Sequence, residues 1–268
     1  AWIVGHRRAG AALARGTRMS DEVLLRARNV VRRFGGLTAV DDVSLELERG
    51  SVHAVIGTNG AGKSTLINVL SGEQRADAGS VELAGVDVTH WPQPRRARAG
   101  LGRTYQRTTV FAPFTVLENC RLCAQARHPH VLSAGAARRC DQSLDDAREA
   151  LRLTRLDALA DRVVATLSHG QRRQLEVAMC VATHPQVLLL DEPLAGMGSE
   201  ETGTMLELLL SLRDGHAIML VEHDMDAVFR IADRITVMVN GAVIATGTPD
   251  AVRSNPLVQA AYLGTEAA

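Results

Sequence analysis

The chain has 268 residues, of which 46% are hydrophobic, enough for the core of one large domain or of a domain with a small subdomain. Its 30 Lys and Arg residues balance 30 Asp and Glu residues, so the charge gives no indication of a nucleic-acid partner. No apolar run approaches the roughly 18 residues of a membrane-spanning helix, so we do not expect the chain to cross a membrane by itself.

Residues 1–20 are rich in Arg, Ala and Gly and contain no acidic side chain. They could form a targeting segment, although their apolar stretch is short and broken by Arg. They could also form a basic arm that touches lipid. We favour a disordered tail, with Met19 as an alternative first residue, because the folded pattern begins directly after Met19. We therefore expect the folded domain at residues 21–268.

The first third of the chain has the hydrophobic patterns of a strand-rich region. Residues 23–47 suggest β structure, and their last part alternates between apolar and polar residues, as a half-buried strand does. Residues 52–56 form a short apolar run, which is typical of a strand buried on both faces. A helix is predicted from Lys63 to about Leu70, and a small hairpin over residues 79–88 that turns at Ala84-Gly85.

Residues 115–166 have helical patterns, with predicted helices at 116–126 and 144–153. We therefore expect a helical subdomain, at about residues 108–168, inserted into an α/β core. Cys120 and Cys123 form a C-x-x-C within the first helix. No second C-x-x-C completes a zinc site and no predicted strand precedes the pair. We interpret these cysteines as small residues on an apolar helix face.

Helices and strands alternate after the insert, which indicates a parallel sheet covered on both faces. Asn240-Gly241 between two apolar runs predicts a hairpin, because both positions of its turn need φ > 0. The predicted elements are helices at 171–183, 200–212 and 225–231, and strands at 187–190, 218–221, 235–239 and 242–245.

Residues 57–64 match the phosphate-binding pattern G-x-x-x-x-G-K-S/T and lie between a predicted buried strand and a helix, as the pattern requires. Their glycines let backbone N–H groups curve around phosphates, and the helix N-terminus adds positive potential. We expect Lys63 to reach the β- and γ-phosphates of ATP and Ser64 to bind Mg²⁺. The predicted nucleotide contacts here are Gly57, Thr58, Asn59, Gly60, Ala61, Gly62, Lys63, Ser64 and Thr65.

Lys63 is also the only lysine among the 30 basic Lys and Arg residues. Its position inside the Gly-rich loop suggests that arginine would not serve there. An ammonium group is a compact point charge on a flexible stem, whereas a guanidinium group is a wide planar fork.

Two acidic residues follow the apolar strand predicted at 187–190. Asp191 and Glu192 should emerge at the sheet edge where the phosphate-binding loop emerges. We expect Asp191 to hold Mg²⁺ through water, and Glu192 to orient or deprotonate the attacking water. A buried strand that ends in acids is a weak signal alone, but together with the loop it predicts ATP hydrolysis.

Residues 167–171, Leu-Ser-His-Gly-Gln, come directly after the helical insert. Ser168 can cap the helix that begins near Gly170, and that helix end can receive an anion. Together with the two motifs above, this pentapeptide resembles the signature motif of ATP-binding-cassette (ABC) ATPases, and the resemblance covers about residues 23–264. It implies that Ser168, Gly170 and Gln171 contact the γ-phosphate of ATP bound to a second cassette.

The resemblance implies an α/β fold: a P-loop NTPase with a RecA-like parallel-sheet core, an antiparallel β subdomain and an inserted helical subdomain. It also assigns three further positions. Phe34 stands where an aromatic side chain stacks on adenine, and Gln106 where a glutamine contacts Mg²⁺. His223 stands where a histidine contacts the γ-phosphate. Alone, each could be structural; the common order of all the motifs favours the functional interpretation.

Several positions depart from the family pattern. His169 replaces a frequent Gly, Gln171 a Glu, and Thr58 a frequent Pro. The segment after Glu192 lacks the Asp usual in the loop that crosses the dimer interface, and Gly198 lies about where it would be. This last departure concerns communication between two sites rather than ATP binding.

Residues 34–40, 103–106, 192–197 and 261–264 together resemble the ATPases of branched-chain amino-acid importers. The Leu-Ser-His-Gly-Gln signature is shared with urea and short-chain amide importer ATPases. The resemblance implies a cytoplasmic, peripheral position on the plasma membrane and three kinds of partner: permease subunits, a second identical or similar ATPase and, indirectly, an extracytoplasmic substrate-binding protein. The alternatives are a urea or short-chain amide importer ATPase and a soluble, non-transport ABC ATPase; a single P-loop and signature argue against the ribosomal kind. A regulatory module that binds nucleotide without hydrolysing it is a further alternative, against which Glu192 and His223 argue.

Overall fold

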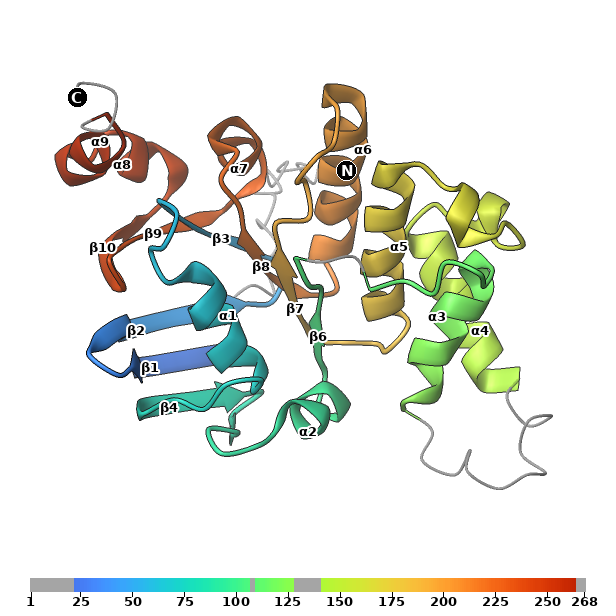
Figure 1. Cartoon of the computed structure of the whole chain (residues 1–268), viewed down its shortest axis with the longest axis horizontal. Coiled ribbons are helices and arrows are strands. Elements are labelled where there is room, and N and C mark those ends of the chain that lie inside the picture. Colours follow the sequence, from blue (N-terminus) through green and yellow to red (C-terminus); the bar gives the residue numbers. More distant parts are fainter. Residues whose placement is uncertain (1–21, 107–108, 128–140, 264–268) are drawn as a thin grey trace, which may run out of the picture.

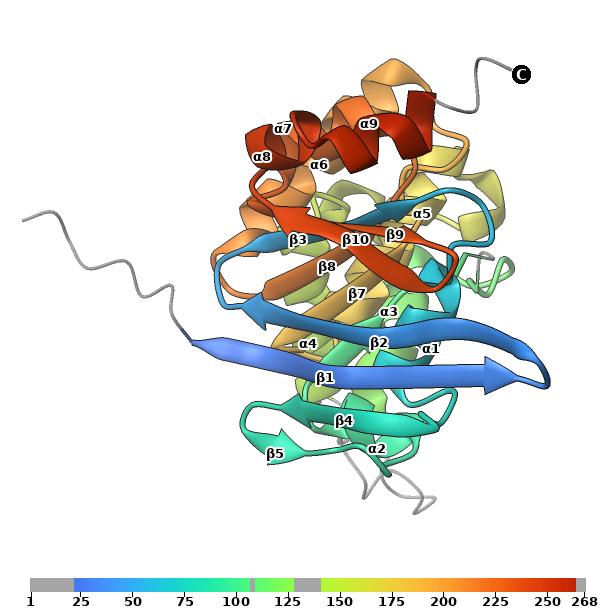
Figure 2. The same cartoon turned by 90° about the vertical axis from the view of Figure 1, so that its left-hand side faces the viewer.

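Two β-sheets organise the chain, one antiparallel and one mostly parallel (Figures 1 and 2). The structure, a computed structural model, describes residues 22–106, 109–127 and 141–263. The expected tail at residues 1–20 and the segment between the two predicted helices of the insert lie largely or wholly outside the described residues.

The antiparallel sheet has the strand order β2-β1-β4-β5. Its turn between β4 and β5 lies at Ala84-Gly85, as predicted, with φ of 47° and 77°. Figure 2 shows its two longest strands, β1 and β2, along one side of the molecule. The strands are β1 (Val23–Phe34), β2 (Leu37–Glu48), β4 (Ala78–Leu83) and β5 (Val86–Asp87).

The second sheet has the order β10-β9-β3-β8-β7-β6, and its five strands from β9 to β6 run parallel. β10 closes one edge as the antiparallel partner of β9 through the predicted Asn240-Gly241 turn, where φ is 49° and 86°. The strands are β3 (Val52–Gly57), β6 (Leu101–Arg103), β7 (Val187–Asp191), β8 (Ala217–Val221), β9 (Arg234–Val239) and β10 (Ala242–Gly247).

Helices cover both faces of this parallel sheet, as the apolar strands require. Helix α1 contacts β1 and β2 as well as β3 and β7, so it lies between the two sheets (Figure 1). The helices are α1 (Lys63–Ser71), α2 (Gln93–Arg98), α3 (Val116–Gln125), α4 (Asp141–Leu153), α5 (His169–Val181), α6 (Ser199–Arg213), α7 (Met225–Ile231), α8 (Pro249–Arg253) and α9 (Pro256–Leu263), with short 3₁₀ turns at Asp157–Leu159 and Val164–Thr166.

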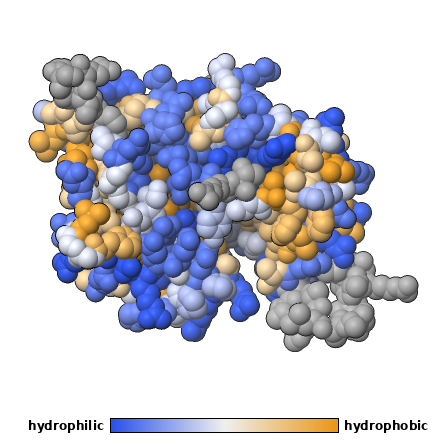
Figure 3. Space-filling view, viewed as in Figure 1, coloured by the Kyte–Doolittle hydropathy of each residue, from blue (hydrophilic) through white to orange (hydrophobic). Residues whose placement is uncertain are grey.

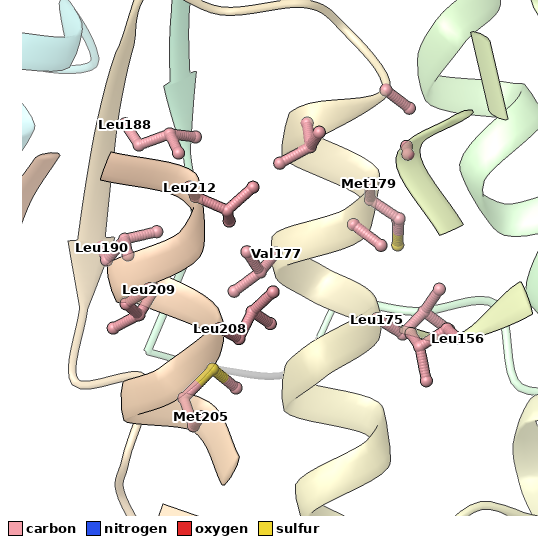
Figure 4. Packing of buried hydrophobic residues seen from close by; sticks show 14 of the residues in the cluster. Leu156, Leu175, Val177, Met179, Leu188, Leu190, Met205, Leu208, Leu209 and Leu212 are labelled. Carbon is pink, nitrogen blue, oxygen red and sulfur yellow. The ribbon is translucent and has the colours of Figure 1, made fainter. Parts of the chain in front are cut away.

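Strand β7 shows how the sequence builds two cores at once. Val187 and Leu189 pack toward α1 and the antiparallel sheet, whereas Leu188 and Leu190 pack toward α5 and α6 (Figure 4). Successive side chains of a strand point to opposite faces, so both faces need apolar residues. All five residues of β7 are buried, which fixes the position of the two acids that follow.

The predicted elements of the α/β core and of the insert are present, with ends shifted by a few residues. Cys120 is buried on α3, and Cys123 packs partly buried against the same apolar cluster. The hydrophobic patterns did not reveal β6, α2, α8 and α9, which are three to eight residues long. Short elements carry too few periodic positions to be recognised.

His53 is the most deeply buried imidazole that the structure describes, with 2% of its surface exposed on β3. Its Nδ1 lies 3.0 Å from the carbonyl oxygen of Glu46, and its Nε2 lies 2.8 Å from the hydroxyl of Thr236. Burial lowers the pKa of His53 to about 4. The neutral ring is therefore part of the folded structure.

This burial predicts a loss of stability in mild acid. Below about pH 6.5 the unfolded chain binds a proton at His53, whereas the folded chain binds it only near pH 4. We expect the free energy of unfolding to fall by up to about 3 kcal/mol between these values. Urea unfolding of the wild type and of His53→Gln at several pH values measures this; equal pH slopes in the two proteins would contradict it.

Candidate ATP-binding site

The phosphate-binding loop joins β3 to α1, as predicted. Gly62 is the N-cap of α1 with φ of 99°, a left-handed conformation that favours glycine. A Cβ at this position would also collide with the carbonyl oxygen of Ala39. The loop is therefore packed against β2, and the backbone path itself requires glycine at position 62.

A cavity of about 520 Å³ lies against this loop. Phe34 and the N-terminal end of β2 form an apolar part of its wall, and Gln106 and Glu192 lie on it with the loop. Of the predicted residues it brings together Phe34, Asn59, Gly60, Ala61, Gly62, Lys63, Ser64, Thr65, Gln106 and Glu192, and it adds Leu37, Thr38, Ala39, Asn240 and Gly241.

The side chain of Lys63 folds back onto the phosphate-binding loop. Its ammonium group donates hydrogen bonds to the carbonyl oxygens of Gly57 at 2.7 Å and Thr58 at 3.0 Å. Burial lowers the pKa of Lys63, while the nearby carboxylates of Glu192 and Asp191 act in the opposite direction. The side chain thus places one positive charge at the cavity that also contains a carboxylate.

Asp191 is buried at the end of β7, with 4% of its surface exposed. Its backbone N–H donates to the Thr104 hydroxyl at 3.2 Å, and its Oδ2 lies 3.9 Å from the Arg103 guanidinium. Burial raises the pKa of Asp191, and Arg103 opposes this shift. Its Oδ1 is buried and has no hydrogen-bond partner among the described residues. A buried carboxylate oxygen of this kind is suited to a cation or to a bound water.

Glu192 has an unusual backbone for a residue with a side chain, with φ of 49°. Such a conformation costs about 1–3 kcal/mol and persists where the surrounding structure enforces it. Its N–H donates to the carbonyl oxygen of Val221 at 2.9 Å, and this hydrogen bond fixes the turn after β7 to the end of β8. Its carboxylate accepts a hydrogen bond from the Gln106 amide at 3.1 Å. The strained turn directs this carboxylate to the cavity.

His223 follows β8, as predicted, but the structure does not bring it to the cavity wall. Its side chain is 62% exposed and its Nδ1 lies 3.8 Å from the Glu222 carboxylate. Glu222 itself is fully buried, and it accepts hydrogen bonds from the N–H groups of Leu194 at 2.8 Å and His223 at 3.2 Å. Glu222 thus ties the loop after β7 to the loop after β8.

Sequence reasoning gave no role to Glu222, Arg103 or Thr104, although they contact Asp191, His223 or the loop that follows Glu192. Arg103 and Thr104 lie at the end of β6, a strand that the hydrophobic pattern did not reveal. The signal for Glu222 was its position directly after an apolar strand, next to His223. The pairing of β6 with β7 places Arg103 and Thr104 beside the two acids at the end of β7.

The signature residues form the N-terminus of α5. Ser168 is the N-cap, and its hydroxyl accepts from the N–H of Gln171 while the Gln171 side chain accepts from the N–H of Ser168. This capping box confirms that Ser168 caps the helix. The Ser168 hydroxyl also donates to the Glu201 carboxylate at 3.0 Å. A Cβ on Gly170 would lie 2.5 Å from the Glu201 carboxyl carbon.

These residues line a second hollow of about 240 Å³, and it shares no residue with the cavity at the phosphate-binding loop. The carboxylate of Glu201 lies in it, at a helix end where an anion is favoured. The chain therefore presents two separate hollows at helix N-termini, one at the loop before α1 and one at the start of α5.

The comparisons with known proteins agree with this geometry. The family model described as "ABC transporter" matches residues 40–195, and the model described as "Branched-chain amino acid ATP-binding cassette transporter" matches residues 242–268. No helix among the described residues is long and apolar enough to cross a membrane.

Two curated relatives are similar along almost their whole length. The high-affinity branched-chain amino acid transport ATP-binding protein BraF of Pseudomonas aeruginosa is 39% identical over 90% of this chain and 98% of its own. The corresponding protein LivG of Escherichia coli is 39% identical over 91% and 99%. A solved structure, the ADP conformation of an ATP-binding cassette of an ABC transporter, is 31% identical with a TM-score of 0.79, over 90% of this chain and 99% of that one.

The fold and the site together define a P-loop ATPase with a parallel-sheet core. The chain belongs to the ABC transporter family, as one of its ATP-binding subunits. It is a transport ATPase that binds and hydrolyses ATP.

The position of Glu192 predicts a separation of binding from hydrolysis. Glu192→Gln keeps the size of the side chain but cannot accept a proton, so we expect ATP hydrolysis to fall by about 100-fold or more while ATP still binds. Phosphate-release kinetics and nucleotide binding measure the two effects. Glu207→Gln, an equal charge change on the exposed side of α6, is the control. Undiminished hydrolysis in Glu192→Gln would show that another group positions the water.

Proposed function

We propose that the chain is the MgATP-hydrolysing subunit of an importer that takes up branched-chain amino acids through separate membrane permease subunits. The observation that carries the proposal is that Lys63, Ser64, Gln106 and Glu192 line the same cavity. A cation, a hydroxyl, an amide and a carboxylate around one phosphate-binding loop are the groups that phosphoryl transfer to water needs. The similarity to BraF and LivG supports the importer and its substrate class.

The proposed chemistry is positioning and stabilisation of charge. The Lys63 ammonium would turn from the carbonyl oxygens of its own loop to the β- and γ-phosphates. Glu192 would orient the attacking water and accept its proton. Phe34 would stack on the adenine at the apolar part of the cavity.

The residues also fit a magnesium ion. The Ser64 hydroxyl, the Gln106 amide oxygen and the buried Asp191 Oδ1 without a partner are oxygen ligands of the kind that Mg²⁺ takes. When bound, the ion would neutralise charge on the phosphates. The hydrogen bond from Gln106 to Glu192 would then link the ion's ligand to the residue that orients the water.

We propose that the second hollow, at the start of α5, accepts an anion and completes the site of a partner cassette. Dimeric cassettes occur among the solved structures of this fold. Ser168, Gly170 and Gln171 would receive the γ-phosphate of ATP bound to the partner. His223, which is exposed in the single chain, would reach the γ-phosphate of the ATP bound at its own loop when the two cassettes close.

The helices between β6 and α5 offer a surface for the permease. Phe111 and Phe114 are stacked with ring centroids 5.6 Å apart and are 53% and 42% exposed, and Val163 is 40% exposed. Figure 3 shows apolar surface gathered over the helices α3 to α5. Exposed apolar patches of this kind mark interaction sites. We propose that this face docks to the permease from the cytoplasmic side of the plasma membrane, so that the helical subdomain at about 108–168 passes on the motion.

Purification from native membranes in mild detergent tests the importer. We expect two permease chains, a second cassette and an extracytoplasmic substrate-binding protein to accompany this chain, and that protein to bind leucine, isoleucine or valine. Lys63→Ala should assemble equally but lose ATP-driven uptake. Binding of urea or a short-chain amide instead would change the substrate class. Recovery without any membrane partner would overturn transport and leave the ATPase.

The position of Glu201 predicts tighter pairing when its charge is removed. Its carboxylate occupies the helix end that the partner's γ-phosphate would enter, and the Ser168 hydroxyl has one proton to donate. In a Glu192→Gln background, Glu201→Gln should lower the dissociation constant of the MgATP-dependent pair by about tenfold. Analytical ultracentrifugation measures this constant, with Glu207→Gln on the same helix, outside the hollow, as the control. Weaker pairing would mean that Glu201 contributes to the closed site.

A further inference from the structure

Phe34 ends strand β1 beside the cavity, and its exposed fraction is 43%. An aromatic ring this exposed rotates between several orientations unless its neighbours hold it. Any ring that stacks on a base must first lose this freedom, which weakens binding. The orientation of Phe34 before the nucleotide arrives is therefore a property on which affinity depends.

Arg32 supplies a contact that restrains the ring. Its guanidinium carbon lies 4.6 Å from the centroid of the Phe34 ring, which is a cation–π contact. Phe34 lines the cavity but Arg32 does not, so the guanidinium covers the ring without occupying the space of the nucleotide.

The guanidinium is itself fixed to the strand by Asp77. The Nη1 of Arg32 donates to Oδ1 of Asp77 at 3.1 Å, and the backbone N–H of Arg33 donates to the other carboxylate oxygen at 2.6 Å. The N–H of Asp77 donates to the carbonyl oxygen of Val31 at 2.8 Å. Asp77 is thus tied to three consecutive residues of β1, and Arg32 is 24% exposed in its side chain.

We propose that Arg32 is a positioning residue for the adenine base. The Arg32 guanidinium, held by Asp77, stacks on the Phe34 ring and fixes its orientation. The face of the ring that is turned to the cavity then receives the base. This inference rests on the proposed function, in which Phe34 stacks on adenine. Arg32 acts through Phe34 and touches no phosphate, so its effect is confined to ligands that carry a base.

The test compares ATP with inorganic tripolyphosphate, which has the phosphates but no base. Arg32→Met removes the cation and keeps an unbranched side chain. It should weaken ATP binding about fivefold and leave tripolyphosphate binding unchanged. The KM for ATP should rise while kcat stays the same, and Arg32→Lys should recover part of the loss. Retained tripolyphosphate binding also shows that the variant is folded.

Arg33→Met is the matched control, because Arg33 is the next residue on the strand, has an exposed side chain and carries the same charge. It should bind both ligands as the wild type does. Equal ATP affinity in Arg32→Met and Arg33→Met would overturn the inference. An equal loss for ATP and tripolyphosphate in Arg32→Met would overturn it too, because the effect would then be a general one of charge or folding.

Phe34→Leu separates this inference from the proposed function. Unchanged ATP affinity in Phe34→Leu would show that the ring does not stack on the base; the role of Arg32 would then be wrong while ATP hydrolysis stands. No ATP binding by the wild type would instead overturn the proposed function itself.

Discussion

The candidate site depends on the parallel pairing of three strands, β3, β8 and β7. Val221 on the central strand lies opposite Val55 of β3 on one side and Asp191 of β7 on the other. The phosphate-binding loop begins two residues after Val55, and Glu192 directly follows Asp191. Parallel strands place their carboxyl ends at one edge of the sheet, so the cation and the two acids meet although almost 130 residues separate them along the chain.

This edge holds groups that a folded chain accommodates at a cost. Glu192 has a left-handed backbone, and burial shifts the pKa of Lys63 downward and that of Asp191 upward. Perturbed groups and strained backbone are concentrated where charge will be bound. The fully buried strands β3, β7 and β8 supply the rigid frame that holds them.

A single chain presents its two hollows at helix N-termini apart from each other. The cavity at Lys63 and the hollow at Ser168 share no lining residue, and Glu201 fills the latter with a carboxylate. His223 is exposed and lines neither of them. Each of these features is explained if the reactive arrangement forms only between two cassettes, and each is a property of the unpaired chain.

The sequence by itself determined the fold class, the loop around Lys63, the acids at the end of β7 and the cap at Ser168, because these rest on local patterns: strand periodicity, a glycine-rich turn and a capping box. Only the tertiary structure decided that Arg103 lies beside Asp191, that Glu201 reaches Ser168 and that Arg32 covers Phe34. The first two contacts join residues that lie 33 or more positions apart, and the third depends on how Asp77 returns to β1. Side-chain contacts of this kind follow from strand register and helix packing, which no local pattern encodes.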